Sequence, residues 1–239
     1  MLKIDLHIHS LHSGHAYGTI YDIIEEASKK NMKMIAITDH GPSFFGSAPE
    51  THFLMGARAP KEYKDVKVLW GCEANIINGQ GDLDLSDRVI KRLDIILAQM
   101  HLPTPYKDLD KEKNTDAIIR CFKKYPIHIF SHPNFISYDY DFEKVCETAC
   151  ENNILLELNL STLGKTRNNK TSFIYLKKMI EIARKHNQKI IINSDAHFLS
   201  EIGDDSILKE YWEELDLSDD IIINNYQDEL LEFIGSKNE

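Results

Sequence analysis

Short apolar runs alternate with amphipathic stretches along the whole chain of 239 residues. The runs are rich in Ile, Leu and Val, and most lack the strict alternation of a half-exposed strand. Such runs are typical of strands that are buried on both faces of a parallel sheet. The seven predicted strands are Leu2–Leu6, Met34–Ile37, Val66–Trp70, Ile95–Ala98, Ile127–Phe130, Leu155–Leu158 and Ile190–Ile192.

Helical patterns fill the spaces between these strands. In the last of them Phe173, Leu176, Ile180 and Ala183 share one face at helical spacing. The predicted helices are Ile20–Lys30, Asp87–Arg92, Thr115–Lys124, Phe142–Asn152 and Ser172–His186. Seven βα units predict a closed or nearly closed α/β barrel in one domain spanning residues 1–239, with a doubly wound open sheet as the alternative.

Two long stretches, Gly41–Ala59 and Leu102–Asn114, are rich in Pro, Gly and polar residues. We predict irregular loops there, and loops of this length in a compact domain often carry function. The chain from Leu208 onward predicts helices that cover the barrel.

The charge and cysteine content narrow the classes of partner. The formal net charge of -10 argues against a nucleic-acid surface, which is normally basic. No apolar run approaches the ~18 residues of a membrane span, and the N-terminus lacks the pattern of a secretory signal. Of the four cysteines, none forms a CxxC pair, and Cys146 and Cys150 are predicted to be packed thiols on a helix. We therefore expect the reducing cytoplasm.

A histidine or a carboxylate follows almost every predicted strand. In a parallel barrel the carboxyl ends of all strands open onto one face, so these residues are predicted to converge in one pocket. His7 and His9 point the same way from one strand, and Asp195 and His197 repeat that spacing at the far end of the chain. The predicted ligands are His7, His9, His15, His40, Glu73, His101, His132, Asp195 and His197.

Histidines with a few carboxylates and no thiolate suit zinc, iron, manganese or cobalt. Nine ligands are too many for one ion and suit about three if a carboxylate bridges two of them. His128 and His186 lie at a strand start and a helix end, so they are left out. His12 and His52 lie in loops near the same face, and His12 is the better candidate for a substrate contact.

The same motifs carry a family resemblance. Asp5-Leu6-His7-Ile8-His9, Thr38-Asp39-His40-Gly41, Gly71-Cys72-Glu73, Ser131-His132-Pro133 and Ser194-Asp195-Ala196-His197 resemble those of the PHP (polymerase and histidinol phosphatase) superfamily. Within it, His15-Ala16-Tyr17 and Glu73-Ala74-Asn75-Ile76 are similar to the small bacterial trinuclear-zinc phosphatases of the YcdX type. The resemblance implies a distorted TIM-like (β/α)7 barrel and a metal-dependent phosphatase that acts on a small phosphate ester.

The resemblance also implies an assignment of ligands. One ion would be held by His7, His9, Glu73 and Asp195, a second by Glu73, His101 and His132, and a third by His15, His40 and His197. Zinc is the expected metal, with manganese and iron as alternatives.

The expected mechanism uses a metal-bound hydroxide, held at Glu73, His101 and Asp195, that attacks phosphorus in line. Cations near the site would hold the phosphate, and Arg58 and Arg167 are the candidates because a guanidinium can bind phosphate through two hydrogen bonds. A surface position is the alternative for each. Asp39 is expected either to orient an imidazole or to cap the following loop.

Two other classes of protein compete with the phosphatase hypothesis. An amidohydrolase-type deaminase or amidase also begins with a His-x-His motif, but it usually places a bridging Lys where this chain has Gln99-Met100-His101. A metal-binding module without activity would be expected to lack some ligands, and here the set is complete. Among phosphatase substrates, histidinol phosphate, nucleotides, sugar phosphates and phosphodiesters remain open, and so does the oligomeric state.

Overall fold

Seven parallel strands form the frame of the protein. The computed structural model describes residues 1–165 and 170–238. The strands pair in the order β1-β2-β4-β5-β6-β7-β8, and the short β3 pairs antiparallel with β4. Their bounds are β1 Ile4–Ile8, β2 Met34–Ile37, β3 Glu62–Tyr63, β4 Val66–Asn75, β5 Ile95–Gln99, β6 Ile129–Phe130, β7 Leu155–Asn159 and β8 Ile191–Asn193.

Side chains rather than a backbone ladder join β1 to β8. The Leu6 amide donates to Asn193 Oδ1 at 2.8 Å, and the Ser194 amide donates to Asp5 Oδ1 at 3.1 Å. Just beyond the strands, the His9 amide donates to the Ala196 carbonyl at 2.9 Å. The sheet is therefore a nearly closed, distorted (β/α)7 barrel, as predicted, and the open-sheet alternative is wrong.

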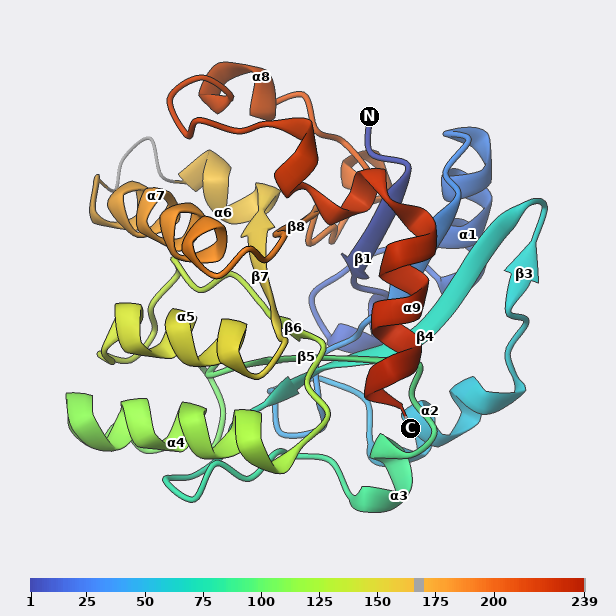
Figure 1. The fold of residues 1–239 in the computed structure, drawn as a ribbon. Helices are drawn as coiled ribbons and strands as arrows, with labels where there is room; N and C mark the ends of the chain where they lie inside the picture. The colour runs from blue at the N-terminus through green and yellow to red at the C-terminus, as the bar shows by residue number, and fades with distance from the viewer. Residues whose placement is uncertain (166–169, 239) are drawn as a thin grey trace.

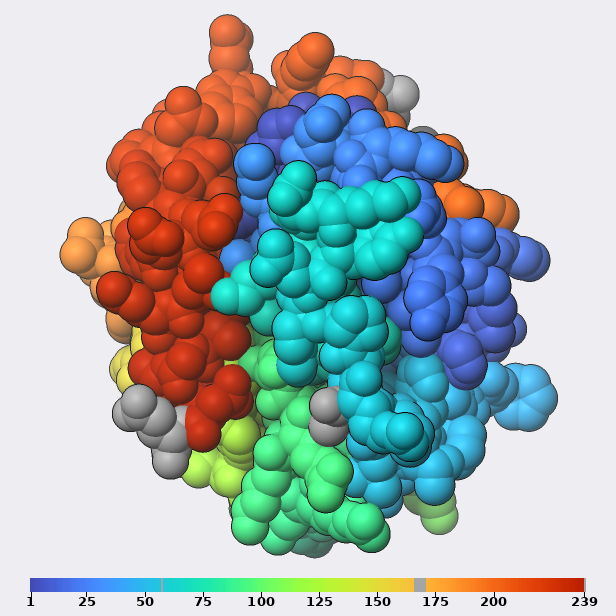
Figure 2. All heavy atoms as spheres, turned by 90° about the vertical axis from the view of Figure 1, so that its right-hand side faces the viewer, coloured from blue at the N-terminus to red at the C-terminus, as the bar shows by residue number. Residues whose placement is uncertain are grey.

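The larger helices lie outside this barrel (Figure 1), where α4, α5 and α7 stack along one side. The N-terminal helices and those after the middle strands are α1 Ile20–Lys29, α2 Glu50–Met55, α3 Asp87–Ile90, α4 Lys111–Lys124 and α5 Phe142–Glu151. The remaining helices are α6 Leu160–Lys165, α7 Lys170–Lys185, α8 Leu208–Tyr211 and α9 Gln227–Lys237. In Figure 2 the C-terminal segment, in red, and the residues around β3, in cyan, cover one side of the molecule.

Both stretches predicted as long loops contain helix. The first holds α2, and the second ends in the first turn of α4, which begins at Lys111 rather than Thr115. The start of α4 is capped by Asp110, whose side chain accepts from the Lys113 amide. This first turn is polar, and α2 has only six residues, so hydrophobic periodicity revealed neither.

The inside of the barrel is arranged in layers along its axis. Inward residues of the amino-terminal halves of the strands, such as Ile4, Met34 and Ile95, form one apolar cluster. Leu230 and Ile234 of α9 belong to the same cluster, so this helix closes the amino-terminal mouth. On β7 the inward side chain after Leu155 is Glu157, which is also fully buried. The interior thus changes from apolar to polar toward the carboxyl ends.

A β-bulge in β1 changes which side chains face inward. The register shifts between Asp5 and Ile8, so β1 has one residue more than β2 over this stretch. Ile4 and Leu6 therefore point into the barrel core, whereas Ile8 packs outward against Ile35 and Ile37. The bulge brings His7 and His9, rather than Ile8, to the inside of the barrel mouth.

The four cysteines are free and buried, as expected for packed thiols. None of the helices in the described ranges is long and apolar enough to cross a bilayer.

Buried His128 is predicted to make the fold acid-sensitive. The ring accepts a hydrogen bond from the Ile96 amide at Nδ1, and burial lowers its pKa from 6.5 to about 4. Between these two values the unfolded chain binds a proton that the folded protein does not, so stability falls as the pH falls. From pH 7 to 4 this group should cost about 3 kcal/mol of unfolding free energy.

The variant His128→Gln keeps an acceptor for Ile96 without the titration. Urea unfolding of both proteins, at equal metal content, should show the wild type losing about 3 kcal/mol relative to the variant between pH 7 and 4. Parallel pH profiles would show that His128 is not responsible.

Candidate metal centre

The nine predicted ligands meet at the carboxyl-terminal mouth of the barrel, around the buried carboxylate of Glu73. Glu73 Oε1 lies 2.9 Å from His132 Nε2 and 3.1 Å from His101 Nε2. Glu73 Oε2 lies 2.9 Å from His40 Nδ1 and 3.3 Å from His7 Nε2. His9 Nε2 is also 3.5 Å from Oε2, so one carboxylate contacts five imidazoles that come from four different strand ends.

Asp195 supplies the second carboxylate. Its Oδ1 atom lies 3.2 Å from His9 Nε2 and 3.6 Å from His7 Nε2. The backbone of Asp195 is left-handed, with φ of 56°, and His132 after β6 also has a positive φ of 29°. Non-glycine residues rarely adopt such angles, and here each sharp turn directs a ligand-type side chain into the mouth.

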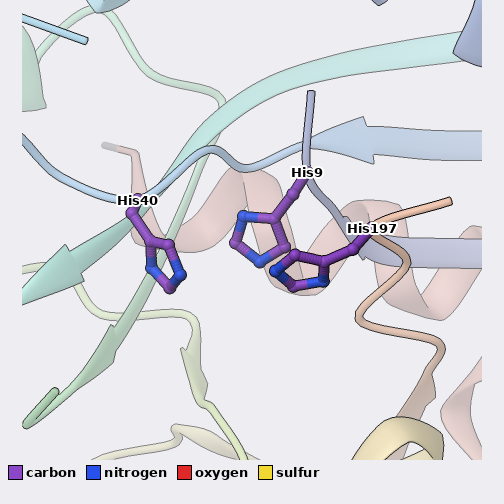
Figure 3. Close-up of side chains that lie close together, drawn as sticks. All are labelled: His9, His40 and His197. Atoms are coloured by element: carbon purple, nitrogen blue, oxygen red, sulfur yellow. The ribbon is translucent and has the colours of Figure 1, made fainter. Parts of the chain in front are cut away.

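A third group of imidazoles lies further out. His15 Nε2 and His197 Nε2 are 2.8 Å apart. The ring centroid of His9 lies 4.5 Å from that of His40 and 4.4 Å from that of His197. Figure 3 shows these last three rings gathered from separate segments of the chain. His40 thus lies between the inner and the outer groups, since it also contacts Glu73.

The second nitrogen of most of these rings faces an oxygen acceptor. An ionised carboxylate, a backbone carbonyl or an amide oxygen only accepts, so the ring must donate its Nδ1 proton to it. The acceptors are Glu157 for His7 at 2.8 Å, Asn75 for His101 at 2.7 Å, the Ser13 carbonyl for His15 at 3.1 Å and the Asp195 carbonyl for His197 at 2.9 Å.

His9 also carries its proton on Nδ1, and it donates this proton to a hydroxyl group. Its Nδ1 lies 2.8 Å from Ser13 Oγ, and this hydroxyl lies 2.7 Å from Asp39 Oδ1. Several hydrogen bonds, including one from His52, hold the pKa of buried Asp39 well below its usual value, so it is ionised and only accepts. Ser13 has one proton and must give it to Asp39. It therefore accepts the Nδ1 proton of His9, which leaves the Nε2 lone pair directed inward.

These proton positions place Nε2 atoms face to face. The Nε2 atoms of His7 and His9 are 3.0 Å apart, and those of His15 and His197 are 2.8 Å apart. Two lone pairs at such distances repel unless a proton or a metal cation lies between them. In addition, His40 Nδ1 and Glu73 Oε2 are buried without a hydrogen bond in the described part of the chain. Imidazole and carboxylate donors in this state fit divalent zinc, manganese or iron.

The ionisation states of the two carboxylates, His9 and His40 agree with this donor set, whereas Glu73 raises the pKa of His132 in spite of burial. The pKa values of Glu73 and Asp195 are lowered by the surrounding histidines in spite of burial, so both carboxylates are charged. Burial lowers the pKa of His9 and His40, which keeps them neutral as metal ligands must be. For His7 burial acts in the same direction, but Glu157, Glu73 and Asp195 raise its pKa well above the usual value. A cation bound at His7 would displace this proton.

Glu157 was not among the predicted site residues. It is fully buried and also accepts from the His132 amide, Asn159 and Asn193. It orients His7 and fixes the turn that carries His132. The signal for it was present in the sequence, because a charged residue inside a predicted fully buried strand needs partners.

The predicted substrate contacts are placed less favourably than the ligands. Arg58 is exposed and lines a separate pocket with Trp70 and Met55. Arg167 lies outside the described residues. His12 stacks on His52 at 4.3 Å between ring centroids, away from the cavity at the ligands. Asn159, at the end of β7, is buried and donates to Glu157.

Asp39 does not bind the imidazole of its neighbour His40, and in the stretch that follows it binds His52 of α2. Its carboxylate accepts from the amide and hydroxyl of Ser10, from Ser13 and from His52 at 3.1 Å. The ligand atoms of His12, Asp39 and His52 lie close enough to hold an ion. Each carboxylate oxygen, however, already accepts two hydrogen bonds, so this group is satisfied without one. Asp39 orients an imidazole, as one alternative predicted, but that of His9 and through Ser13.

A cavity of about 410 Å³ opens onto the inner ligands. Its polar wall includes Glu73, His101, His132 and Asp195, and its apolar wall includes Phe44, Leu102 and Phe135. A volume of this order suits a small organic ligand.

Known proteins resemble this chain along almost its whole length. The model of the PHP domain family matches residues 5–233. The chain belongs to the PHP domain family. A probable phosphatase of Clostridium botulinum is 34% identical over 238 residues, covering 98% of this chain and 95% of that one. A probable phosphatase of Pectobacterium carotovorum is 33% identical and covers 99% and 96%.

The PHP fold is also found in a crystal structure of histidinol phosphate phosphatase from Lactococcus lactis, complexed with zinc, L-histidinol and phosphate. The TM-score is 0.58 at 12% identity, and the match covers 90% of this chain and 94% of that one. At this identity the likeness concerns the fold alone.

The Ser13 relay, by which we mean the hydrogen bonds from His9 to Ser13 and from Ser13 to Asp39, gives a direct prediction. Ser13→Ala removes the acceptor of the His9 proton, so the ring is free to rotate or to change tautomer. We expect divalent-metal affinity to fall about 10–100-fold in competition with a chelator. Thr115→Val, which removes a buried hydroxyl on α4, is the control and should leave metal affinity unchanged. Equal affinities in all three proteins would show that the relay does not orient His9.

Proposed function

We propose that this protein is a metal-dependent phosphatase that hydrolyses small phosphate esters at a centre of about three divalent ions. The observation that carries the proposal is the convergence of imidazole nitrogens, with the Nε2 atoms of His7 and His9 3.0 Å apart and those of His15 and His197 2.8 Å apart, beside two ionised carboxylates. The naming of full-length relatives as probable phosphatases and the presence of zinc and phosphate in the Lactococcus complex support it.

The proposed ligands form three groups. His7, His9, Glu73 and Asp195 would hold one ion, Glu73, His101 and His132 a second, and His15, His40 and His197 a third. Contacts within each group support this division, since every member lies near another member. The contact between His40 and Glu73 would link the second and third ions.

When bound, the ions would supply a nucleophilic water at neutral pH and positive charge for the phosphoryl oxygens. The chain itself holds the ligands in one protonation state through Glu157, Asn75 and Ser13. The apolar wall of the cavity would exclude bulk water from the reacting face. Zinc is the first candidate, with manganese and iron as alternatives.

An amidohydrolase usually places a bridging Lys where this chain has Gln99-Met100-His101, and here Gln99 makes structural hydrogen bonds. Gln99 donates to the Ser131 carbonyl and accepts from the Met100 amide, so it is not available to an ion or a substrate. We expect hydrolysis of 4-nitrophenyl phosphate with no turnover of 4-nitroacetanilide or of adenosine as a deaminase substrate. Turnover of the amide or of adenosine in place of the ester would favour the rival class.

The metal content tests the centre itself. Elemental analysis of protein purified without chelator or histidine tag should give about three divalent ions per chain. Dialysis against a chelator should abolish phosphatase activity, and added zinc or manganese should restore it. About one ion would favour a mononuclear hydrolase, and metal-free protein that stays inert after metal is supplied would refute the proposal.

Single variants test the outer ion. His40→Ala should lower kcat/KM for 4-nitrophenyl phosphate at least about a hundredfold and reduce the metal content. His186→Ala, at the end of α7 and outside the centre, is the matched control and should resemble the wild type. Equal activity of the two variants would show that His40 does not take part in the site.

A further inference from the structure

The apolar wall of the cavity, which lies beside the ligands, has a chemistry of its own. Phe135 and Leu102 line it with 49% and 59% of their surface exposed. The third residue, Phe44, stacks on His40 with 4.0 Å between the ring centroids. Large apolar side chains exposed beside a cavity are suited to an apolar part of a ligand. The phosphate would lie at the ligands, so the apolar side chains beside them would contact the alcohol part of the ester.

Lys165, at the end of α6, adds one positive charge to this wall. It is the single Lys or Arg among the described residues that line the cavity. Its ammonium lies 5.7 Å from the centroid of the Phe135 ring, and that ring packs edge-on to His132 at 6.2 Å. The charge is therefore one aromatic ring further out than the inner ligands. In the described part of the chain no carboxylate forms an ion pair with it.

The one other carboxylate among the described lining residues, besides Glu73 and Asp195, is Glu201. One of its oxygens accepts from the backbone amides of His197 and Phe198, at 2.8 and 3.0 Å. These amides offset part of its charge, because they are the free donors at the start of the short helix η4 (Leu199–Glu201). Glu201 is thus held by backbone donors, whereas the Lys165 ammonium has no ion-pair partner among the described residues.

We propose that the pocket selects phosphate monoesters whose alcohol part carries an aromatic or other flat apolar body and a negatively charged group. Lys165 is the specificity-determining contact for that group, and Phe135 and Leu102 contact the apolar body. The inference rests on the phosphatase proposal and narrows it to one substrate class. It also disfavours esters whose alcohol carries an ammonium, such as L-histidinol phosphate.

Three aryl phosphates with one ring and different charge form the test. They are 4-(carboxymethyl)phenyl, 4-methylphenyl and 4-(2-aminoethyl)phenyl phosphate. An sp³ carbon separates the charge from the ring, so the leaving phenols have similar acidity. With metal-loaded wild type we expect kcat/KM to fall in this order, by about fivefold at each step, as for one partly exposed charge pair.

Variants assign the preference to one side chain. Lys165→Ala should bring the anionic-to-neutral ratio of kcat/KM close to one, and Lys165→Glu should reverse the order of the anionic and cationic esters. Lys177→Ala is the matched control, because the Lys177 ammonium also lies over a ring, that of Phe173 at 5.1 Å, but does not line the cavity. Its ratio should equal that of the wild type.

The outcomes separate the two proposals. If the wild type with metal hydrolyses none of the three esters, the phosphatase proposal fails. If it hydrolyses them without the charge order, or with an order that both Lys165 variants keep, the phosphatase proposal stands and the assignment of Lys165 is wrong.

Discussion

Mutual repulsion among closely spaced donor groups is the constraint on which the rest of this structure depends. Seven imidazoles and two ionised carboxylates lie at the mouth of the barrel, with ring nitrogens as close as 2.8 Å. Such an arrangement needs protons or metal cations between its lone pairs and carboxylate charges. It persists only where the surrounding chain fixes each ring in place. The acceptors Glu157, Asn75 and Ser13 do this from inside the barrel.

The layers of the barrel interior explain how the fold tolerates this density of polar groups. The amino-terminal half is filled with apolar side chains and closed by α9, which supplies Leu230 and Ile234. Gly71 lies between the apolar layer and Glu73, and a Cβ there would meet Ile95 and Thr38 within 3 Å. The close approach of β4 to its neighbours thus needs a glycine. The apolar half stabilises the barrel, and the polar half is free to serve the metal centre.

Family membership and site geometry bear on different parts of the function. The match to the PHP family across residues 5–233 accounts for the order of the strand-end motifs. The state of the donors comes from contacts of this chain, such as the Ser13 hydroxyl that links His9 to Asp39. The wall with Lys165 and Phe135 belongs to neither the ligands nor their acceptors, and it is there that the chain would distinguish one phosphate ester from another.

The sequence by itself determined the seven strands, the barrel and the gathering of the His and carboxylate residues at one mouth. Short Ile- and Val-rich runs define buried parallel strands, and the carboxyl ends of such strands share one face, so the His and carboxylate residues after them had to meet. Only the tertiary structure decided the details that depend on contacts between distant segments. The bulge in β1 that turns His7 inward, the hydrogen bond from His7 to Glu157 150 residues away and the position of Arg58 in another pocket are of this kind. Local patterns carry the period of a strand, but register, tautomer and pocket lining are set by the partner that packing brings alongside.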